Sequence, residues 1–215
     1  MLNTIAEILI WVIPVLLAIT VHEAAHGYVA RYFGDPTAER AGRITLNPLR
    51  HIDPMGTIVV PLLIYISSSM AGSPMAFGWA KPVPVNFARL RNPKADMLWV
   101  AAAGPFSNLV MATGWALLYS LAPRGVPIDP YAQMALVGVG VNGVLLFLNL
   151  LPIPPLDGGR IVVSLLPERL AWKFARIEPY GFPILILLIA TGALDLILGP
   201  LLNSFRTILM MLFGR

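Results

Sequence analysis

Long apolar stretches separated by short polar connections constrain the fold of this chain more than any other feature of its sequence. They run through residues 5–21, 55–71, 97–121, 132–151 and 182–198. A helix needs about 20 apolar residues to cross the hydrocarbon core of a bilayer, and several of these stretches are that long. With 57% hydrophobic and 12% charged residues, the composition excludes an ordinary soluble domain and indicates an integral membrane protein.

The stretches predict an all-α, polytopic helical bundle of about five to six transmembrane or re-entrant segments. We expect helices over 4–33, 95–121 and 132–151. A further apolar helix over 182–198 is expected to end at Gly199-Pro200, because proline removes a backbone donor and clashes with the preceding turn.

Residues 1–215 are expected to form a single membrane-embedded domain. Its core covers about 4–166, and additional C-terminal apolar segments cover 181–213, to which the sequence assigns no role. Alternating residues at 42–46 and the proline-spaced run 77–86 favour a small re-entrant β element beside the helices.

Basic residues predict the orientation of the chain in the membrane. Arginine and lysine gather at 31–50, 81–94 and 160–176, whereas the loop 122–131 carries only one arginine. If 55–71 re-enters without crossing, all three basic clusters face the cytoplasm and the chain starts outside. If it crosses, the clusters are split between the two sides, so re-entry is favoured.

Charge and cysteine content narrow the possible partners and chemistry. The net charge of +4 comes from short loops between apolar segments, so we expect no nucleic-acid partner. The chain has no cysteine, which excludes disulfides, thiolate zinc sites and cysteine nucleophiles. Any metal ion must therefore be bound by histidine and carboxylate.

Two histidines and a glutamate lie in the first apolar segment, in the run His22-Glu23-Ala24-Ala25-His26. Four residues of helix place the two imidazoles about 40° apart in projection, so both can reach one metal ion while Glu23 lies beside them as general base. Ionisable groups inside an apolar helix are expensive and usually functional. The alternative is a pair of buried histidines that bond to helix neighbours.

A catalytic zinc ion takes three protein ligands, so a third must come from elsewhere in the chain. Asp157 is favoured, because the prolines of 152–155 unwind the backbone before it and the glycines of 158–159 allow close approach. Non-helical backbone at membrane depth is tolerated only where it is packed in protein or lines a watery cavity. The alternatives are a helix-capping role for Asp157 and His51 as the third ligand.

The run 77–86 offers a way to hold an unwound substrate. If it forms a strand, its prolines blunt one edge, and the amides of Lys81, Val83 and Val85 on the other edge are free to pair with substrate. A simple proline-rich connector is the alternative.

Three motifs in order resemble those of the site-2 protease family of intramembrane metalloproteases. They are His22-Glu23-x-x-His26 followed by Gly27, then Ala103-Gly104-Pro105-x-x-Asn108, then Asn149-Leu-Leu-Pro-Ile-Pro-Pro-Leu-Asp-Gly-Gly-Arg160. The resemblance spans roughly 15–165 and is of a compact type without an inserted PDZ or CBS domain.

The resemblance implies one catalytic Zn²⁺ ion with His22, His26 and Asp157 as ligands. It also implies that Asn149 positions the substrate or the transition state and that Asn108 supports the core. Interhelical hydrogen bonding is the alternative for both asparagines and is favoured for Asn108.

The expected function is therefore hydrolysis of peptide bonds in or near transmembrane segments of other membrane proteins. The resemblance implies the inner membrane of a prokaryote, with the active site nearer the cytoplasmic side, while homo-oligomers and adaptors stay open. A metal-ion transporter is the first rival, although no repeat halves are visible. A non-catalytic membrane scaffold is the second, although all four expected catalytic groups are present.

Overall fold

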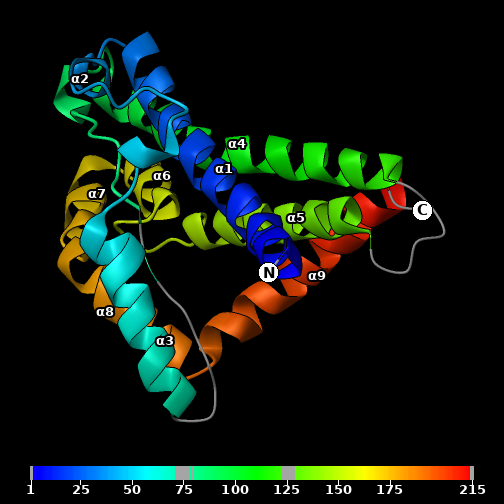
Figure 1. Ribbon diagram of the computed structural model, residues 1–215. Coiled ribbons are helices and arrows are strands. Elements are labelled where there is room, and N and C mark those ends of the chain that lie inside the picture. Colours follow the sequence, from blue (N-terminus) through cyan, green and yellow to red (C-terminus); the bar gives the residue numbers. More distant parts are fainter. Residues whose placement is uncertain (1, 71–77, 79, 123–128, 214–215) are drawn as a thin grey trace.

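The computed structural model describes residues 2–70, 78, 80–122 and 129–213. Within these ranges the chain is helical and contains no strand (Figure 1). The helices in chain order are α1 (Leu2–Tyr32), α2 (Thr37–Arg40), η1 (Pro48–Arg50), the π-helical η2 (Pro54–Val59), α3 (Val60–Met70), η3 (Phe87–Arg89), α4 (Pro93–Leu121), α5 (Pro130–Asn149), α6 (Asp157–Leu165), α7 (Glu168–Ala175), α8 (Glu178–Ala190) and α9 (Ala193–Phe213).

Three helices of the described chain, α1, α5 and α9, are long and apolar enough to cross a membrane. They carry large apolar side chains on their outer surfaces, such as Trp11 on α1 and Leu196 and Met211 on α9, which are 61%, 79% and 79% exposed. Exposed apolar surface of this extent is expected for a protein whose outer surface contacts lipid. The chain is thus an integral membrane protein, as predicted.

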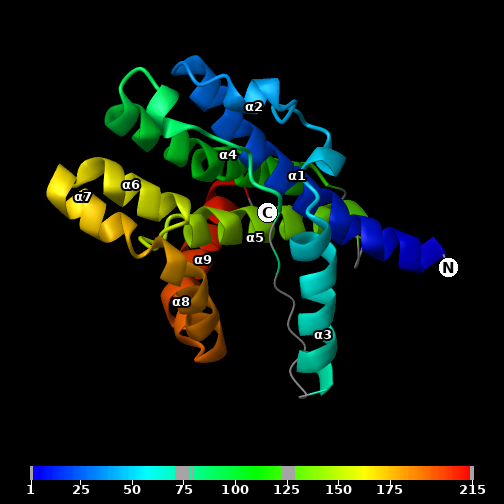
Figure 2. The same ribbon diagram turned by 90° about the vertical axis from the view of Figure 1, so that its left-hand side faces the viewer.

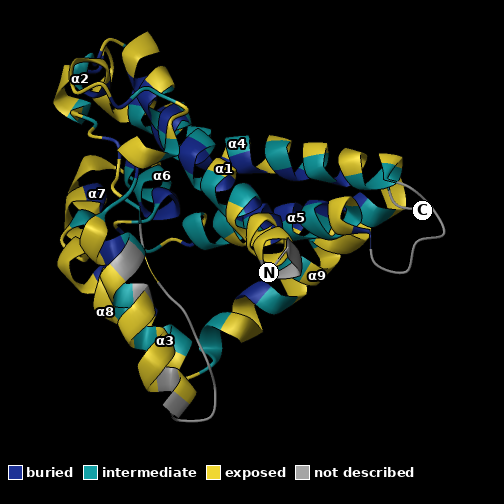
Figure 3. Ribbon diagram, in the orientation of Figure 1, coloured by how far each residue is buried: buried dark blue, intermediate teal, exposed yellow. Residues whose placement is uncertain are grey.

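The core of the molecule is the packing of α1, α4 and α5 on one another (Figures 1 and 2). Small residues line these interfaces, among them Ala24 on α1, Ala112 on α4 and Ala135 on α5, all buried. Small side chains let helix backbones approach closely, which favours association in lipid. The buried positions accordingly follow the facing sides of these helices, and the exposed positions follow their outer sides (Figure 3).

The C-terminal helix α9 closes one end of this core. Its Leu209 is buried with Ala112, Ala116 and Val139 in one apolar cluster, against which Phe205 packs. Of the apolar segments beyond residue 181, α9 is thus packed against α4 and α5, and α8 contacts α9.

The backbone unwinds between α5 and α6, as the prolines predict. α5 ends at Asn149, α6 begins at Asp157, and residues 150–156 between them form turns without a helix. The Pro154-Pro155 peptide bond in this segment is cis. Residue 157 is therefore presented at the start of a new helix, beside the core.

Two expectations about backbone structure were wrong. Residues 42–46 form bends and 80–86 an extended connection, so no β element is formed by the described residues, and 77 and 79 lie outside them. Arg43 and His51, rather than a partner strand, hold the connection through their bonds to Lys81.

The break between the last two helices also lies earlier than expected. It falls at residues 191–192, where Gly192 adopts a φ of +72°, a left-handed geometry that glycine accepts without strain. Pro200 instead lies inside α9. Membrane helices tolerate an internal proline because neighbouring groups satisfy the freed backbone acceptor.

Candidate metal centre

His22 and His26 lie one helical turn apart on α1, and each ring is held by a bond at its Nδ1 atom. His26 Nδ1 is 2.7 Å from the carbonyl oxygen of Val100, which can only accept, so Nδ1 of this ring donates. His26 Nε2 therefore presents its lone pair when the ring is neutral.

The same tautomer follows for His22 from its contact with Asn108, which is completely buried on α4. Asn108 Nδ2 donates to the carbonyl of Ala18 and to Oδ1 of Asn142, which leaves Oδ1 of Asn108 facing His22. His22 Nδ1 lies 2.6 Å from that oxygen and donates to it. In their neutral forms both histidines thus direct the lone pair of Nε2 to one point, and metal-binding histidines characteristically donate their other nitrogen in this way.

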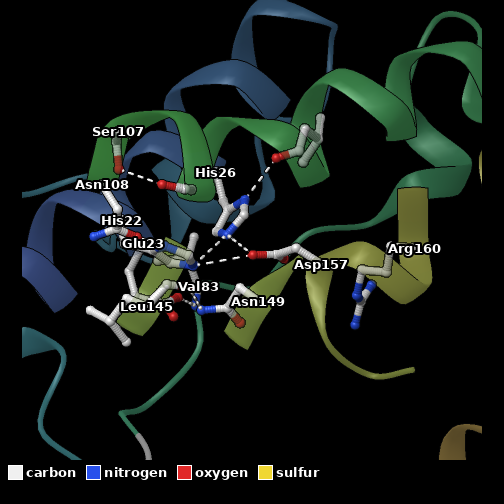
Figure 4. Close-up of polar contacts among 12 residues, drawn as sticks. His22, Glu23, His26, Val83, Ser107, Asn108, Leu145, Asn149, Asp157 and Arg160 are labelled. Carbon is white, nitrogen blue, oxygen red and sulfur yellow. Dashed lines mark hydrogen bonds and ion pairs between the residues drawn. The ribbon is translucent and has the colours of Figure 1, made fainter. Parts of the chain in front are cut away.

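Asp157 completes a triangle with the two rings (Figure 4). Its Oδ2 is 3.2 Å from His22 Nε2 and 3.3 Å from His26 Nε2, and the two Nε2 atoms are 3.1 Å apart. Ligand atoms about 2.05 Å from a tetrahedral zinc ion are separated by about 3.3 Å. The observed triangle therefore has the size of one face of a zinc tetrahedron.

The electrostatics of this triangle call for a cation. Oδ2 of Asp157 is buried and receives no hydrogen bond from any described residue. Three acceptor atoms converge at a depth where an unsatisfied charge is costly. Among the described residues these three side chains form the group that could hold a metal ion, and the donor set suits zinc.

Helix α4 passes so close to the triangle that only glycine fits there. A Cβ atom on Gly104 would lie 2.4 Å from His26 Nε2 and 2.6 Å from His22 Nε2. Real Cβ atoms do not approach other atoms this closely. Gly104 thus keeps open the space in front of the ligand atoms, a role that the sequence motif did not reveal.

The two glycines after Asp157 fix its position against the unwound segment. A Cβ on Gly158 would lie 2.3 Å from the carbonyl oxygen of Leu150, and one on Gly159 would lie 2.4 Å from the nitrogen of Pro154. α6 therefore packs backbone against backbone on residues 150–154, as expected for glycine.

Both alternatives to Asp157 as a ligand are unsupported by the geometry. Asp157 is the first residue of α6 and follows the N-cap residue Leu156, and its buried Oδ2 has no hydrogen-bond partner among the described residues. His51 is buried, but its Nε2 bonds to the carbonyl of Thr45, 3.0 Å away, and it is not part of the group that could hold a metal.

Glu23 follows the first ligand on α1 and is half-buried. Its Oε2 accepts a hydrogen bond from the backbone amide of Val83 at 2.7 Å. Figure 4 shows Glu23 and Val83 beside the imidazole of His22. The carboxylate is thus held in place by the connection 80–86.

Three further bonds hold that connection over α1. Lys81 N donates to the carbonyl of His51 at 2.9 Å, Arg43 Nη2 donates to the carbonyl of Lys81 at 2.7 Å, and Asn86 N donates to Asp35 Oδ2 at 2.6 Å. The expectation of free amides is therefore wrong for Lys81 and Val83. The amide of Val85 has no acceptor among the described residues.

Asp35 is the buried anchor of this connection, just beyond the end of α1. Burial disfavours its charged form, but hydrogen bonds from the hydroxyl and amide of Thr37 and from the amide of Asn86 outweigh burial. They hold the pKa of the Asp35 carboxyl below its ordinary value. The anchor is therefore an ionised carboxylate at neutral pH.

The two asparagines of the motifs lie in different surroundings. Asn108 contacts His22 directly, whereas Asn149 is half-buried, and its Nδ2 bonds to the carbonyl of Leu145 one turn earlier at 3.0 Å. Asn142, which sequence reasoning missed, is completely buried and orients Asn108. The sequence does mark Asn142, because it is a polar residue in an apolar helix, two turns before Asn149 on the same face.

Comparisons with known proteins identify relatives that are named as zinc metalloproteases. A model of peptidase family M50 matches residues 122–191. The chain is 39% identical over 209 residues to a Bacillus subtilis (strain 168) protein named "Putative zinc metalloprotease YwhC", covering 94% of this chain and 90% of the relative. It is 35% identical over 185 residues to Rip2 of Mycolicibacterium smegmatis, named likewise, covering 84% of this chain and 66% of the relative. No solved structure matches the chain.

Proposed function

Because this chain belongs to peptidase family M50, the site-2 protease family, we propose that it is an intramembrane zinc metalloendopeptidase with His22, His26 and Asp157 as ligands and Glu23 as general base. The single observation that carries the proposal is the convergence of three acceptor atoms within 3.3 Å of one another beside a glutamate.

The protein's own residues divide the work as follows. Asn108 and the carbonyl of Val100 fix the tautomers of the two imidazoles, so that both direct a lone pair inwards. Asp157 supplies the negative charge of the ligand set. A zinc ion held there supplies Lewis acidity to a scissile carbonyl and to an attacking water molecule.

Glu23 is proposed to move the proton. The amide of Val83 holds Oε2, so Oε1 is the oxygen that accepts a proton from the attacking water and later returns it to the leaving amine. A carboxylate held in one orientation does this without first being reoriented.

Substrates are proposed to be membrane proteins with a transmembrane segment that unwinds locally before hydrolysis. Asn149, the last residue of α5 before the unwound segment, is proposed to bind substrate, and the amide of Val85 is available to pair with it. At Lys81 and Val83 a substrate would have to displace the carbonyl of His51 or the carboxylate of Glu23. The inner membrane of a prokaryote, with the site nearer the cytoplasmic side, stays part of the proposal.

The transporter and scaffold alternatives have less support. The matched relatives are named as metalloproteases, and a glutamate beside two converging histidines has a function in hydrolysis that neither transport nor scaffolding requires.

The test is zinc binding and proteolysis by the purified protein in detergent. The wild type is expected to bind one zinc ion per chain and to cut members of a panel of single-pass membrane proteins in a zinc-dependent way. Asp157→Ala is expected to lose both zinc and cutting. Full zinc occupancy and activity in Asp157→Ala would remove Asp157 from the ligand set, and ion transport without cutting would reject the proposed function.

A further inference from the structure

Helix α8, which precedes the C-terminal helix α9, contacts the segment that leads to the third proposed ligand. A Cβ atom on Gly181 would lie 1.6 Å from the carbonyl oxygen of Pro154 and 2.8 Å from Cδ of Pro155. The atom in the way is backbone, which cannot rotate aside as a flexible side chain could. α8 is therefore seated directly on the unwound segment.

Pro154 is packed between two helices, α6 on one side and α8 on the other. Gly159 of α6 packs on its nitrogen, and Gly181 of α8 packs on its carbonyl oxygen. Pro154 is buried, although the residues on either side of it are less so. The backbone leading to Asp157 thus lies between two helices that approach through glycine.

A second contact joins α6 to α8 at the same place. Nη2 of Arg160 lies 3.8 Å from Oε1 of Glu178, and the guanidinium also lies over the ring of Phe87, 5.0 Å from its centroid. The ion pair is half-exposed and adds little energy by itself. The ion pair instead fixes the orientation of α8, because it joins the first residue of α8 to α6, the helix that begins with Asp157.

The buried side of α8 is narrow and points to this contact. Gly181 and Leu185 are the buried residues of the helix and lie one turn apart, hence on one face. Leu185 is 5% exposed and so marks the packed face of the helix, and Gly181 on that face sets how closely α8 approaches the segment.

We propose that Gly181 is a positioning residue for the metal centre: it lets α8 seat the 150–156 segment so that Asp157 reaches His22 and His26. This inference rests on the zinc site proposed above. The C-terminal apolar segments, which lie beyond the three sequence motifs, thereby acquire a role at the proposed metal centre.

Magnitudes decide whether a methyl group at this position matters. An ordinary contact between carbon and a carbonyl oxygen is roughly 3.3 Å, so a Cβ placed 1.6 Å away would force a shift approaching 2 Å between α8 and the segment. Metal sites tolerate ligand displacements of about 0.2 Å. Transmission of even a fifth of the shift to Asp157 would distort the ligand triangle.

The test is the zinc affinity of Gly181→Ala in detergent, measured by competition with a chelator, together with the absorption spectrum of Co²⁺ at the site. We expect affinity to fall about 10- to 100-fold, as for other residues that orient metal ligands, and the Co²⁺ spectrum to change because a ligand moves. Gly199→Ala is the matched control, since a Cβ there meets nothing within 4 Å. It should leave both readouts unchanged.

A second variant covers the case in which Gly181→Ala does not accumulate as folded protein. Leu185→Ala removes the buried anchor of α8 without adding a clash, and it should weaken zinc binding in the same direction but less. Leu187→Ala, at a position 62% exposed on the same helix, is its control.

The outcomes separate the inference from the proposed function. Unchanged zinc affinity and Co²⁺ spectrum in folded Gly181→Ala overturn the inference, as does unchanged affinity in Leu185→Ala when the glycine variant cannot be made. A merely structural role would lower the thermal midpoint of the metal-free protein and leave both metal readouts alone. A wild-type protein that binds no zinc rejects the proposed function instead.

Discussion

α1 supplies two of the proposed metal ligands from one uninterrupted helix, whereas the third proposed ligand follows the unwound segment 150–156. The two imidazoles are brought together by helical periodicity, a local property of the chain. Asp157 is brought to them by contacts of Gly158, Gly159 and Gly181 with backbone far from α1 in sequence. The comparison shows that one side of the centre depends on secondary structure and the other on tertiary packing.

Glu23→Gln should give the largest effect and tests whether α1 contributes chemistry as well as ligands. Loss of the base should lower the rate of substrate cutting by about 10²- to 10⁴-fold, while zinc content stays at the wild-type level. Cutting is followed on a single-pass substrate and zinc by elemental analysis. Zinc loss in this variant would mean that Glu23 is a ligand.

Gly104→Ala tests whether the space between the two sides is as restricted as the distances indicate. The added methyl group would collide with Nε2 of both histidines, so zinc affinity and activity should fall by about 100-fold, the upper end for residues that shape a metal site. Gly114→Ala on the same helix, where a Cβ meets nothing within 4 Å, is the control. Zinc affinity is the measurement, and an unchanged value in Gly104→Ala would contradict the geometry of the centre.

Asn108→Ala should weaken the α1 side without removing a ligand. His22 loses the acceptor that fixes its tautomer, so zinc affinity should drop about 10- to 100-fold. Asn142→Ala should also lower the zinc affinity, but by less, because Asn142 bonds to Asn108 and not to His22 itself. Equal zinc affinities in wild type and Asn108→Ala would show that helical geometry alone orients His22.

Asp35→Asn should give the smallest effect on activity, because Asp35 acts on the connection 80–86 rather than on a ligand. Hydrogen bonds keep the pKa of Asp35 below its ordinary value in the folded protein, so its carboxylate stabilises the fold above the unfolded pKa of about 3.9. That contribution is lost as pH falls through the lowered, folded pKa. We expect the thermal midpoint of the wild type to fall below about pH 4, and that of Asp35→Asn to fall less over this range. Parallel pH profiles would contradict the role of this carboxylate.

The sequence predicts the part of the site on α1, His22 and His26, more fully than the part that depends on packing between helices. The spacing of His22 and His26 fixes their common face once the segment is a helix. The prolines and glycines around Asp157, which mark unwound backbone, predict it as the third ligand. The bonds that orient the imidazoles, from Asn108, Asn142 and the carbonyl of Val100, depend on how α4 and α5 lie against α1, which periodicity does not specify.

The predicted β element failed for a related reason. Proline spacing correctly indicated extended backbone at 80–86, but whether such backbone joins a strand depends on its neighbours. Here the neighbours are side chains and a loop carbonyl: Glu23, Asp35, Arg43 and His51 take the backbone groups that a strand would have used. Likewise, the role of Gly181 could not be predicted, because its contact partner at Pro154 is distant along the chain.

The packing of Pro154 between Gly159 and Gly181 also has a consequence for how the protein folds as it is synthesised. The chain is made from its N-terminus, at about 5–20 residues per second in cells, so α1 enters the bilayer well before α8 leaves the ribosome. Until then the turn before Asp157 lacks one of its two supports. A nascent chain therefore carries both imidazoles before α8 supports the segment that leads to Asp157, so the proposed metal centre is completed only late in synthesis.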